Sequence, residues 1–207
     1  MGLFLSRNIA NFIVSSISLS EKFVGKLSPG QFENMVSLVS RKGRHLQRYD
    51  NKGCRQVVGC IPYRFRHATK CSSVEELEVL LISSQKSQAM MFPKGGWEID
   101  ESMEEAALRE TIEEAGVLGK VENKLGKWRY KSKSQGTTHE GHMFALLVKQ
   151  QLDLWPEQNV RKRRWLTVSE AKEVCQHSWM KEALDELVRR QKDLLQQVKE
   201  KDETVCK

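Results

Sequence analysis

One segment, residues 95–117, constrains this chain more than any other because it concentrates acidic residues in a basic protein. It holds eight acidic residues and one basic residue, Arg109, whereas the whole 207-residue chain carries a formal net charge of +7. Ser102 followed three residues later by Glu105 has the spacing of a capping box, and Gly116 suits a helix C-terminus. We therefore predict a helix over about residues 103–115.

The predicted helix has one apolar face and one charged face. At about 100° per residue, the charged side chains gather on one side and the apolar and small side chains on the other. The charged face comprises Arg109, Glu110, Glu113 and Glu114, and the opposite face comprises Ala107, Leu108, Thr111, Ile112 and Ala115. Glutamates three and four residues apart meet on the helix surface and repel one another. The two interpretations are a solvated acidic helix and a site for a divalent cation that relieves this repulsion.

The residue types favour a hard metal ion and a phosphorylated ligand. Carboxylate oxygens select Mg²⁺ or Mn²⁺, and Mg²⁺ usually keeps waters and accepts further ligands from a phosphate. Gly95 and Gly96 precede the helix, and glycine allows main-chain groups to approach a metal or a phosphate closely. The segment therefore predicts metal-assisted chemistry on a phosphorylated molecule.

Short apolar runs rich in β-branched residues predict strands on both sides of this helix. The expected strands cover residues 56–65, 78–83, 90–93, 124–133, 141–149 and 163–166. From about Ser169 the pattern is helical, with an apolar stripe that predicts core packing and comprises Met180, Leu184, Leu187, Leu194 and Val198. Strands interrupted by one helix and closed by another predict an α+β fold in which a mixed sheet lies between helices.

The acidic segment also resembles the signature of a known enzyme family. It reads Gly95, five residues, Glu101, seven residues, then Arg109-Glu110-Thr111-Ile112-Glu113-Glu114-Ala115-Gly116-Val117. This is similar to the Nudix box, G-x5-E-x7-R-E-U-x-E-E-x-G-U, in which U is aliphatic, at eight of nine defined positions. Thr111 is the exception, and it lies on the predicted buried face.

The resemblance implies an architecture, a reaction and a set of roles. The architecture is the Nudix α/β/α sandwich, with a mixed β-sheet, a catalytic loop-helix-loop and a C-terminal helix. The reaction is attack of water on a phosphorus atom of a phosphoanhydride. Glu110 and Glu114 would bind the metal, and Glu113 would act as the base or a further ligand. Arg109 would orient a glutamate, and Glu101 would support the loop.

Three groups of basic residues outside the acidic segment indicate a ligand with several phosphates. Period-two alternation places Lys127, Arg129, Lys131 and Lys133 on one strand face, with Trp128 and Tyr130 on the other. The other groups are Arg161-Lys162-Arg163-Arg164, and Arg41, Lys42, Arg44, His45 and Arg48. A solvated surface is the alternative for the strand. Nucleic acid is a second alternative, but no RNA- or DNA-binding motif is present and we expect no stable nucleic-acid partner.

Residues from about His45 to Gln176 resemble the diphosphoinositol polyphosphate phosphohydrolases, particularly their plant Nudix relatives. The similarity is carried by residues 48–50, 80–84, 92–98, 154–157 and 161–165. It implies hydrolysis of a small-molecule polyphosphate, either a diphosphoinositol polyphosphate or a diadenosine polyphosphate. By position, the substrate would contact Arg48, Arg55, Ser83, Ser84, Gly95, Gly96, Arg161 and Lys162. Glu140 departs from the arginine of animal members, and Trp97, Trp128 and Tyr130 are candidates for stacking on a nucleobase.

Two other functions stay open. The first is hydrolysis of another nucleoside diphosphate derivative, such as ADP-ribose or capped RNA. The second is a non-catalytic Nudix module that binds polyphosphates or RNA. The complete glutamate set favours catalysis because a binding module has no need of it.

We interpret residues 1–40 as a leader, residues 41–195 as the hydrolase domain and residues 196–207 as a charged tail. The serine-rich, acid-poor leader is typical of a mitochondrial or plastid transit peptide, with an untargeted cytoplasmic extension or an N-myristoylated anchor as alternatives. No apolar run reaches the roughly 18 residues of a membrane span. The five scattered cysteines predict neither a zinc site nor a disulfide framework. The oligomeric state stays open.

Overall fold

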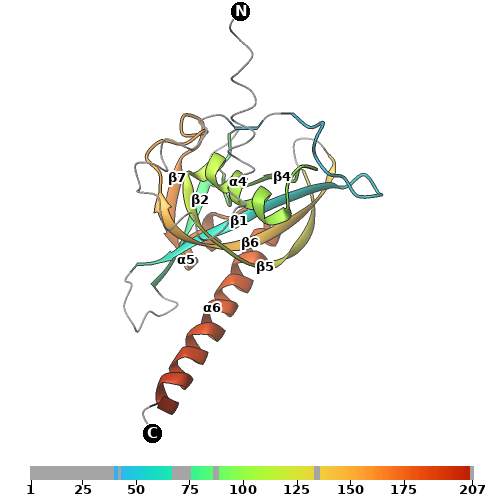
Figure 1. Ribbon diagram of the computed structural model, residues 1–207. Coiled ribbons are helices and arrows are strands. Elements are labelled where there is room, and N and C mark those ends of the chain that lie inside the picture. The colour runs from blue at the N-terminus through green and yellow to red at the C-terminus, as the bar shows by residue number, and fades with distance from the viewer. Residues whose placement is uncertain (1–39, 42, 67–75, 86–88, 133–135, 206–207) are drawn as a thin grey trace, which may run out of the picture.

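The computed structural model describes residues 40, 41, 43–66, 76–85, 89–132 and 136–205, and a mixed sheet of seven strands lies at the centre of this described part (Figure 1). The strands are β1 (Arg55–Phe65), β2 (Leu77–Ser83), β3 (Met90–Met91), β4 (Lys94–Gly96), β5 (Val117–Lys131), β6 (Thr138–Gln151) and β7 (Arg163–Thr167). The helices are α4 (Met103–Ala115), α5 (Val168–Val174) and α6 (Ser178–Val205).

The sheet is organised around β1. Its strand order is β3-β2-β1-β6-β5, and β4 pairs with β1 while β7 pairs with β2. β1 runs parallel to β6, whereas the other pairs are antiparallel. Residues 63–65 of β1 pair with β2, and residues 57–59 pair with β4. β4 and the loop that leads into α4 therefore lie beside the first half of β1.

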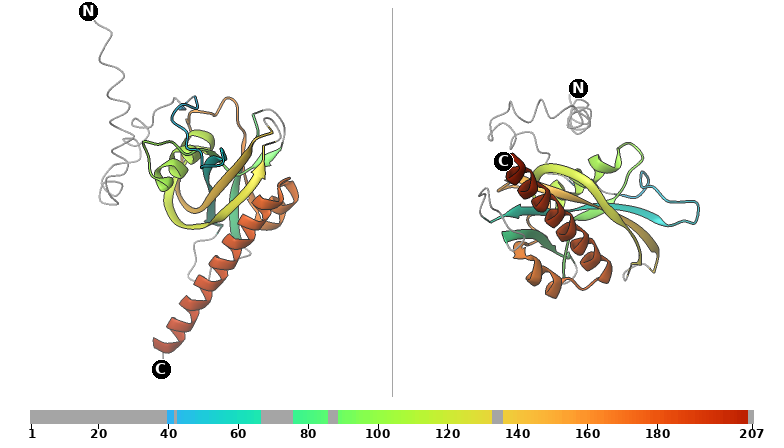
Figure 2. Two further views of the ribbon diagram at one scale, coloured as in Figure 1. Left: turned by 90° about the vertical axis from the view of Figure 1, so that its right-hand side faces the viewer. Right: turned by 90° about the horizontal axis from the view of Figure 1, so that it is seen from below.

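A helix covers each face of the sheet because alternate side chains of β1 point to opposite faces. Cys60 belongs to the core cluster that includes Ala107 of α4. Ile61, the next residue along β1, belongs to the cluster that includes Leu184 of α6. Figure 2 shows α4 and α6 on opposite sides of the sheet. The predicted α+β sandwich with a mixed sheet and a C-terminal helix is confirmed.

Several strand limits differ from the prediction. β5 begins at Val117, directly after α4, and not at Lys124, while β6 begins at Thr138 and not at Gly141. The pairing of β5 with β6 has irregularities at 118/119, 121/124 and 124/126, and these interrupt the alternation that marks a strand. Lys133 and most of the predicted leader, residues 1–39, lie outside the described residues.

The C-terminal region also differs, because two helices replace the single one predicted from Ser169. α5 ends at Val174, and α6 begins at Ser178. Leu184 and Leu187 are fully buried, but Leu194 and Val198 are 50% and 52% exposed. The prediction of core packing is wrong for these last two, because α6 extends away from the sheet (Figure 1). Within the described residues, no helix combines the length and apolar character needed to cross a membrane.

Candidate active site

α4 has the ends that its sequence predicts. The Ser102 side chain accepts the Glu105 main-chain N–H, and the Glu105 carboxylate accepts the Ser102 N–H, so both bonds of the capping box form. The helix ends at Gly116, whose φ of 61° lies in the left-handed region that favours glycine. Thr111 is fully buried, and its hydroxyl donates to the Ala107 carbonyl at 2.7 Å. The unusual threonine is thus accommodated by a hydrogen bond to the preceding turn.

β4 brings the main chain of Gly95 against α4. A Cβ at Gly95 would lie 2.1 Å from the carboxyl carbon of Glu110, so only glycine fits without displacing that carboxylate. A Cβ at Gly96 would lie 2.4 Å from Nε2 of Gln47. The two glycines were expected to allow close approach to a metal or a phosphate, and in the structure their main chains lie close to the side chains of Glu110 and Gln47. The sequence predicted no strand over Lys94–Gly96, but this segment forms a strand paired with β1.

Arg109 joins α4 to the loop that precedes it. Its guanidinium donates to both carboxylate oxygens of Glu101, at 2.7 and 2.9 Å, and to the Gly96 carbonyl at 3.0 Å. It also donates to Glu110 at 2.8 Å and lies 3.6 Å from Glu113. The side chain is buried. Arg109 therefore fixes the loop and two of the predicted site glutamates through one planar group.

Burial and mutual repulsion raise the pKa of all three glutamates on the charged face. Burial raises the pKa of Glu113 to about 7, with a further contribution from the charge of Glu110 and an opposing one from Arg109. Burial raises the pKa of Glu114 to about 8, against the lowering effect of Arg161. Burial likewise raises the pKa of Glu110. Three carboxyl groups that resist ionisation together are typical of a site that awaits a cation.

Each of the three carboxylates also has a partner within the protein. Glu110 accepts from Arg109, Glu113 accepts the Arg41 main-chain N–H at 3.3 Å, and Glu114 pairs with Arg161. Glu114 also accepts the Lys94 main-chain N–H at 2.8 Å. No three acidic, histidine or cysteine side chains among the described residues form a ready-made ligand cluster. The oxygen chemistry and raised pKa values of the three carboxylates nevertheless suit a divalent cation.

Several residues predicted to bind substrate meet beside Glu114. Arg161 pairs with Glu114 and Glu157 and donates to the Ser83 carbonyl at 3.0 Å. The Lys162 main-chain N–H donates to Ser83 Oγ at 2.9 Å. Ser84, the next residue, donates its main-chain N–H to the Ala89 carbonyl. The structure brings Ser83, Arg161 and Lys162 together, and Arg161 is engaged by carboxylates.

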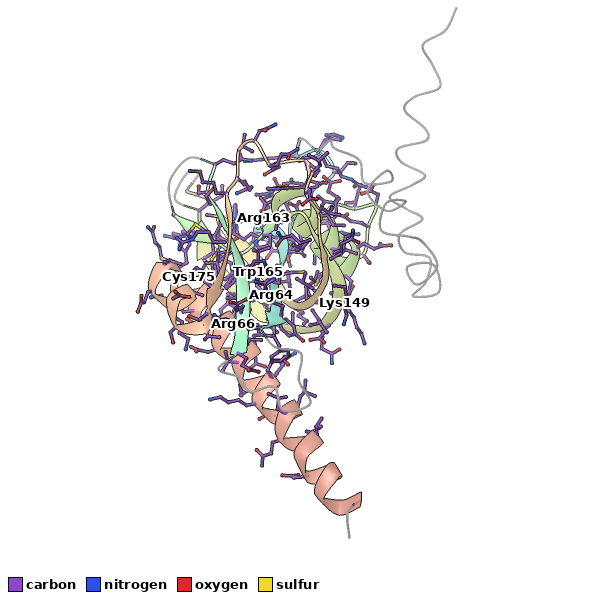
Figure 3. All side chains as sticks on the ribbon, turned by 90° about the vertical axis from the view of Figure 1, so that its left-hand side faces the viewer. Arg64, Arg66, Lys149, Arg163, Trp165 and Cys175 are labelled. Carbon is purple, nitrogen blue, oxygen red and sulfur yellow. The ribbon has the colours of Figure 1, made fainter. Side chains whose placement is uncertain are left out.

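Other members of the predicted basic groups have structural partners. Arg48 donates to the carbonyls of Glu98 and Ile99 and lies 4.3 Å above the Trp97 ring. The Arg41 guanidinium donates to Glu98 at 2.6 Å and to Asp100 at 3.1 Å. These arginines therefore face the acidic loop. Arg163, which is labelled in Figure 3, belongs to the basic run that was predicted to bind phosphates. Its guanidinium instead donates to the carbonyls of Ala115 and Gly116 at the end of α4 and to the carbonyl of Leu152.

The predicted alternation of basic and aromatic side chains along β5 is confirmed. The partners of both sets are protein side chains. Arg129 pairs with Glu140 at 2.8 Å, and Lys127 lies 3.9 Å from the same carboxylate. Glu140, the departure from the animal enzymes, thus offsets this basic face. Tyr130 stacks on Trp179 with ring centroids 4.7 Å apart, and Trp128 donates to Glu182 at 2.9 Å. Both β5 aromatic rings therefore pack against α6 and are not placed to stack on a nucleobase.

Two titratable residues on the strands around β1 were missed by the sequence reasoning. Lys94 is opposite Gly59 in the sheet, and its Nζ lies 3.6 Å from the Met91 sulfur. Burial lowers the pKa of Lys94, with Glu114 and Arg161 exerting opposite effects. His139 is opposite Arg55, and burial lowers its pKa to about 4, with Arg55 and Lys94 adding to the effect. Their positions depend on strand register, for which the sequence gave no local signal.

Comparison with known proteins agrees with this geometry. The NUDIX domain family matches residues 55–190. The chain is a member of the Nudix family. It is 59% identical over 180 residues to "Nudix hydrolase 17, mitochondrial" of Arabidopsis thaliana, covering 84% of this chain and 98% of the relative. It is 59% identical over 172 residues to "Nudix hydrolase 21, chloroplastic" of the same plant, covering 83% and 84% of the two chains. As a Nudix pyrophosphohydrolase it belongs to a family that typically uses a divalent metal.

More distant proteins support the same family and fold. The mouse protein "Diphosphoinositol polyphosphate phosphohydrolase 3-alpha" is 34% identical over 139 residues, covering 65% of this chain and 77% of that protein. A NUDIX hydrolase from Nitrosomonas europaea superposes with a TM-score of 0.53 at 18% identity, covering 65% and 88% of the chains. The C. elegans Ap4A hydrolase binary complex gives a TM-score of 0.52 at 19% identity, covering 67% and 98%. The two structures share the Nudix fold with this chain.

Proposed function

We propose that this Nudix enzyme hydrolyses a phosphoanhydride bond in a highly phosphorylated small molecule, either a diphosphoinositol polyphosphate or a diadenosine polyphosphate. The observation that carries the proposal is a group of three largely buried glutamates on one face of α4, of which Glu114 contacts Arg161 and the main chain of Lys94. The carboxylates suit a metal, and the flanking cations suit phosphates. The mouse relative's name supports the inositol class.

In this proposal each residue at the end of α4 has a separate task. Glu110 and Glu114 would hold Mg²⁺ or Mn²⁺, which would supply positive charge to the phosphate oxygens and activate the attacking water. Glu113 accepts the proton of the attacking water, since a carboxylate beside the metal is placed to act as a base. Arg109 keeps Glu110 in position and joins the helix to Gly96.

Substrate contacts are proposed for residues on the neighbouring strands. Arg161 releases part of its carboxylate pairing to a phosphate, and Arg55 and Lys94 add positive charge on the same side of the sheet. Ser83, Ser84, Gly95 and Gly96 present hydrogen-bond donors to the same phosphates, and Lys162 is available to a further phosphate of the substrate. Arg48 acts through the loop that it holds by the carbonyls of Glu98 and Ile99.

A panel assay tests the activity and the substrate together. Phosphate release is measured with Mg²⁺ or Mn²⁺ on diphosphoinositol, diadenosine, ADP-ribose and capped-RNA substrates, for the wild type and for Glu114→Gln. We expect the variant to stay folded and to lose turnover by orders of magnitude. Glu104→Gln is the matched control, because Glu104 is an exposed glutamate in the first turn of the same helix. Near-wild-type metal-dependent activity in Glu114→Gln would refute the metal assignment.

The panel also separates the alternative functions. Release only from ADP-ribose or capped RNA would replace the polyphosphate substrate with another nucleoside diphosphate derivative. Tight binding of a polyphosphate or RNA without release of phosphate would indicate a non-catalytic module.

We further propose that the leader directs the chain to a mitochondrion or a plastid, with the cytoplasm as the alternative. Relatives named mitochondrial and chloroplastic support the proposal. A fusion of residues 1–40 to a fluorescent protein tests it, and a diffuse cytosolic signal would remove the targeting interpretation.

A further inference from the structure

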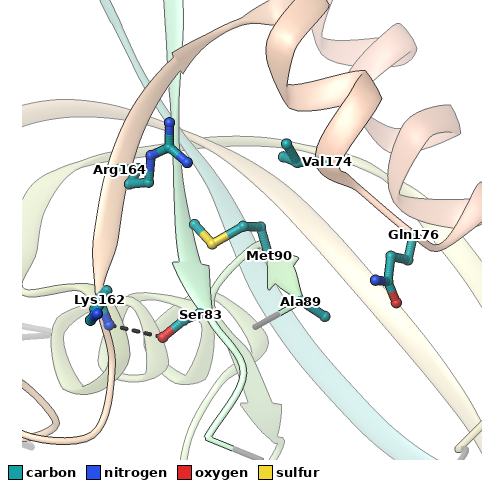
Figure 4. A pocket seen from close by; sticks show the side chains of 7 residues that line it. All are labelled: Ser83, Ala89, Met90, Lys162, Arg164, Val174 and Gln176. Atoms are coloured by element: carbon teal, nitrogen blue, oxygen red, sulfur yellow. Dashed lines mark hydrogen bonds between the residues drawn. The ribbon is translucent and has the colours of Figure 1, made fainter. Parts of the chain in front are cut away.

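A second concentration of positive charge lies at the edge of the sheet formed by β2, β3 and β7. A cavity of about 410 Å³ is present there, within the range of roughly 300–1,000 Å³ that is usual for small-molecule sites. Its lining comprises Ser83, Met90, Lys162, Arg164, Val174 and Gln176, together with Ala89 (Figure 4). The main chains of Met90 and Cys175 form an isolated β-bridge, which joins β3 to the segment between α5 and α6 beside the cavity.

The basic run at residues 161–164 is divided between two faces. Arg161 pairs with Glu114 and Glu157, and Arg163 binds carbonyls at the end of α4. Arg164 is opposite Leu81, which belongs to the core on the α6 side of the sheet, whereas Arg163 is opposite Ile82 on the α4 side. Successive strand side chains point to opposite faces, so every second cation of the run is directed away from the glutamates.

Among the described residues, no carboxylate forms an ion pair with either of the two cations that line the cavity. Neither the Lys162 nor the Arg164 side chain forms a hydrogen bond or an ion pair with another residue in the part of the chain that the structure describes. Glu170 is in electrostatic range of Arg164, but its carboxylate accepts the N–H and hydroxyl of Thr167 at the start of α5. Two unpaired cations beside one cavity repel each other, and an anion between them relieves that repulsion.

Ser83 connects this cavity to the glutamates. It lines the cavity, its Oγ accepts the Lys162 N–H, and its carbonyl accepts from Arg161 at 3.0 Å. The same Arg161 guanidinium contacts Glu114. Arg161 therefore contacts both a residue that lines the cavity and the predicted metal ligand.

We infer that this cavity is an anion subsite for a phosphate group of the substrate other than the one under attack. The inference rests on the proposed function, and it assigns to Lys162 and Arg164 the selection of substrates with many phosphates. The side chains of Met90 and Val174 form an apolar wall, which strengthens the attraction between the cations and a bound phosphate by excluding water. A substrate with two phosphates occupies the glutamate site alone and leaves the subsite empty.

The test compares substrates of different length in a double variant, Lys162→Gln with Arg164→Gln. We expect KM for diadenosine hexaphosphate to rise at least about tenfold, the usual factor for a charge-assisted hydrogen bond, with little change in kcat. KM for ADP-ribose should stay within about twofold of the wild type. The charge-matched control is Lys149→Gln with Lys192→Gln, which removes two exposed lysines that do not line the cavity. It should leave both KM values unchanged.

A binding measurement keeps the inference testable apart from catalysis. Calorimetry with inorganic tripolyphosphate, without divalent metal, should show an affinity weakened at least about tenfold in the double variant and unchanged in the control. Wild-type affinity for tripolyphosphate in the double variant would overturn the subsite, and so would an equal rise in KM for both substrates. If the wild type hydrolyses no substrate of the panel, the proposed function fails, and the calorimetric result still decides the subsite.

Discussion

Gly95→Ala is the substitution that most directly tests whether Glu110 is part of the active site. A Cβ at Gly95 would lie 2.1 Å from the Glu110 carboxyl carbon, and ordinary contact begins near 3.4 Å. The carboxylate must therefore retreat by about 1.3 Å, the difference between those two distances. The φ of Gly95 is not in the left-handed region, so alanine fits the backbone. The strain falls on the end of a flexible side chain, and the fold can absorb it.

The expected result is a large loss of activity with little loss of stability. Metal ligands tolerate only about 0.2 Å of displacement, and a misplacement of about 1 Å can reduce the rate about a hundredfold. We expect kcat to fall by about that factor and the Mg²⁺ concentration for half-maximal activity to rise. The free energy of unfolding should change by less than about 1 kcal/mol. Steady-state kinetics across a Mg²⁺ series and urea unfolding measure the two quantities.

Gly96→Ala is the matched control. Its Cβ would meet Gln47 at 2.4 Å and Arg55 at 2.9 Å, and Glu110 is not among its close neighbours. We expect this variant to alter KM while the Mg²⁺ dependence stays that of the wild type. If Gly95→Ala kept the wild-type kcat and Mg²⁺ dependence, the reasoning that places a metal at Glu110 would be refuted.

Three further predictions concern the residues around this site. Arg109→Lys should lower the free energy of unfolding by about 2 kcal/mol or more and reduce kcat, because lysine cannot replace the bidentate bond to Glu101; chemical denaturation and kinetics measure both. Thr111→Val should change the free energy of unfolding by less than about 1 kcal/mol, because the hydroxyl bond is lost without leaving a buried donor unpaired; the same denaturation assay checks this. Burial lowers the pKa of His142 to about 4, and the charge of Lys124 adds to this effect. The pKa in the unfolded chain is about 6.5, so the contribution of neutral His142 to the free energy of unfolding is complete above about pH 6.5 and declines as the pH falls toward 4. Unfolding at a series of pH values should show a loss of up to about 3 kcal/mol, and His142→Gln should reduce it.

Local signals in the sequence were sufficient for α4. The capping box, the terminal glycine and the apolar spacing all act within one or two turns, so their outcome depends little on the rest of the chain. The same holds for the alternation of Arg129 and Tyr130 on β5, which the structure reproduces. The Nudix family and its fold followed from this one segment, because its spacing fixes both a helix and a charged face.

The partners of the charged side chains were not accessible to the same reasoning. Lys94 lies beside the glutamates because β4 pairs with β1 opposite Gly59, and no residue near position 94 encodes that register. Arg41 and Arg48 appeared to belong to a phosphate site, but the fold places them against the acidic loop. A count of charges along the sequence therefore overestimates the positive charge that is available to a ligand.

The run at residues 161–164 shows how the fold converts one sequence feature into two sites. Four consecutive cations on a flexible segment would act as one basic patch, but the antiparallel pairing of β7 with β2 directs Arg163 to α4 and Arg164 to the opposite face. The two faces therefore differ in the positive charge they offer. Arg161 is paired with Glu114 and Arg163 is hydrogen-bonded to carbonyls at the end of α4, whereas Lys162 and Arg164 stay unpaired among the described residues. Alternation along a strand thus separates the cations that hold the catalytic helix from those that are available to a phosphorylated ligand.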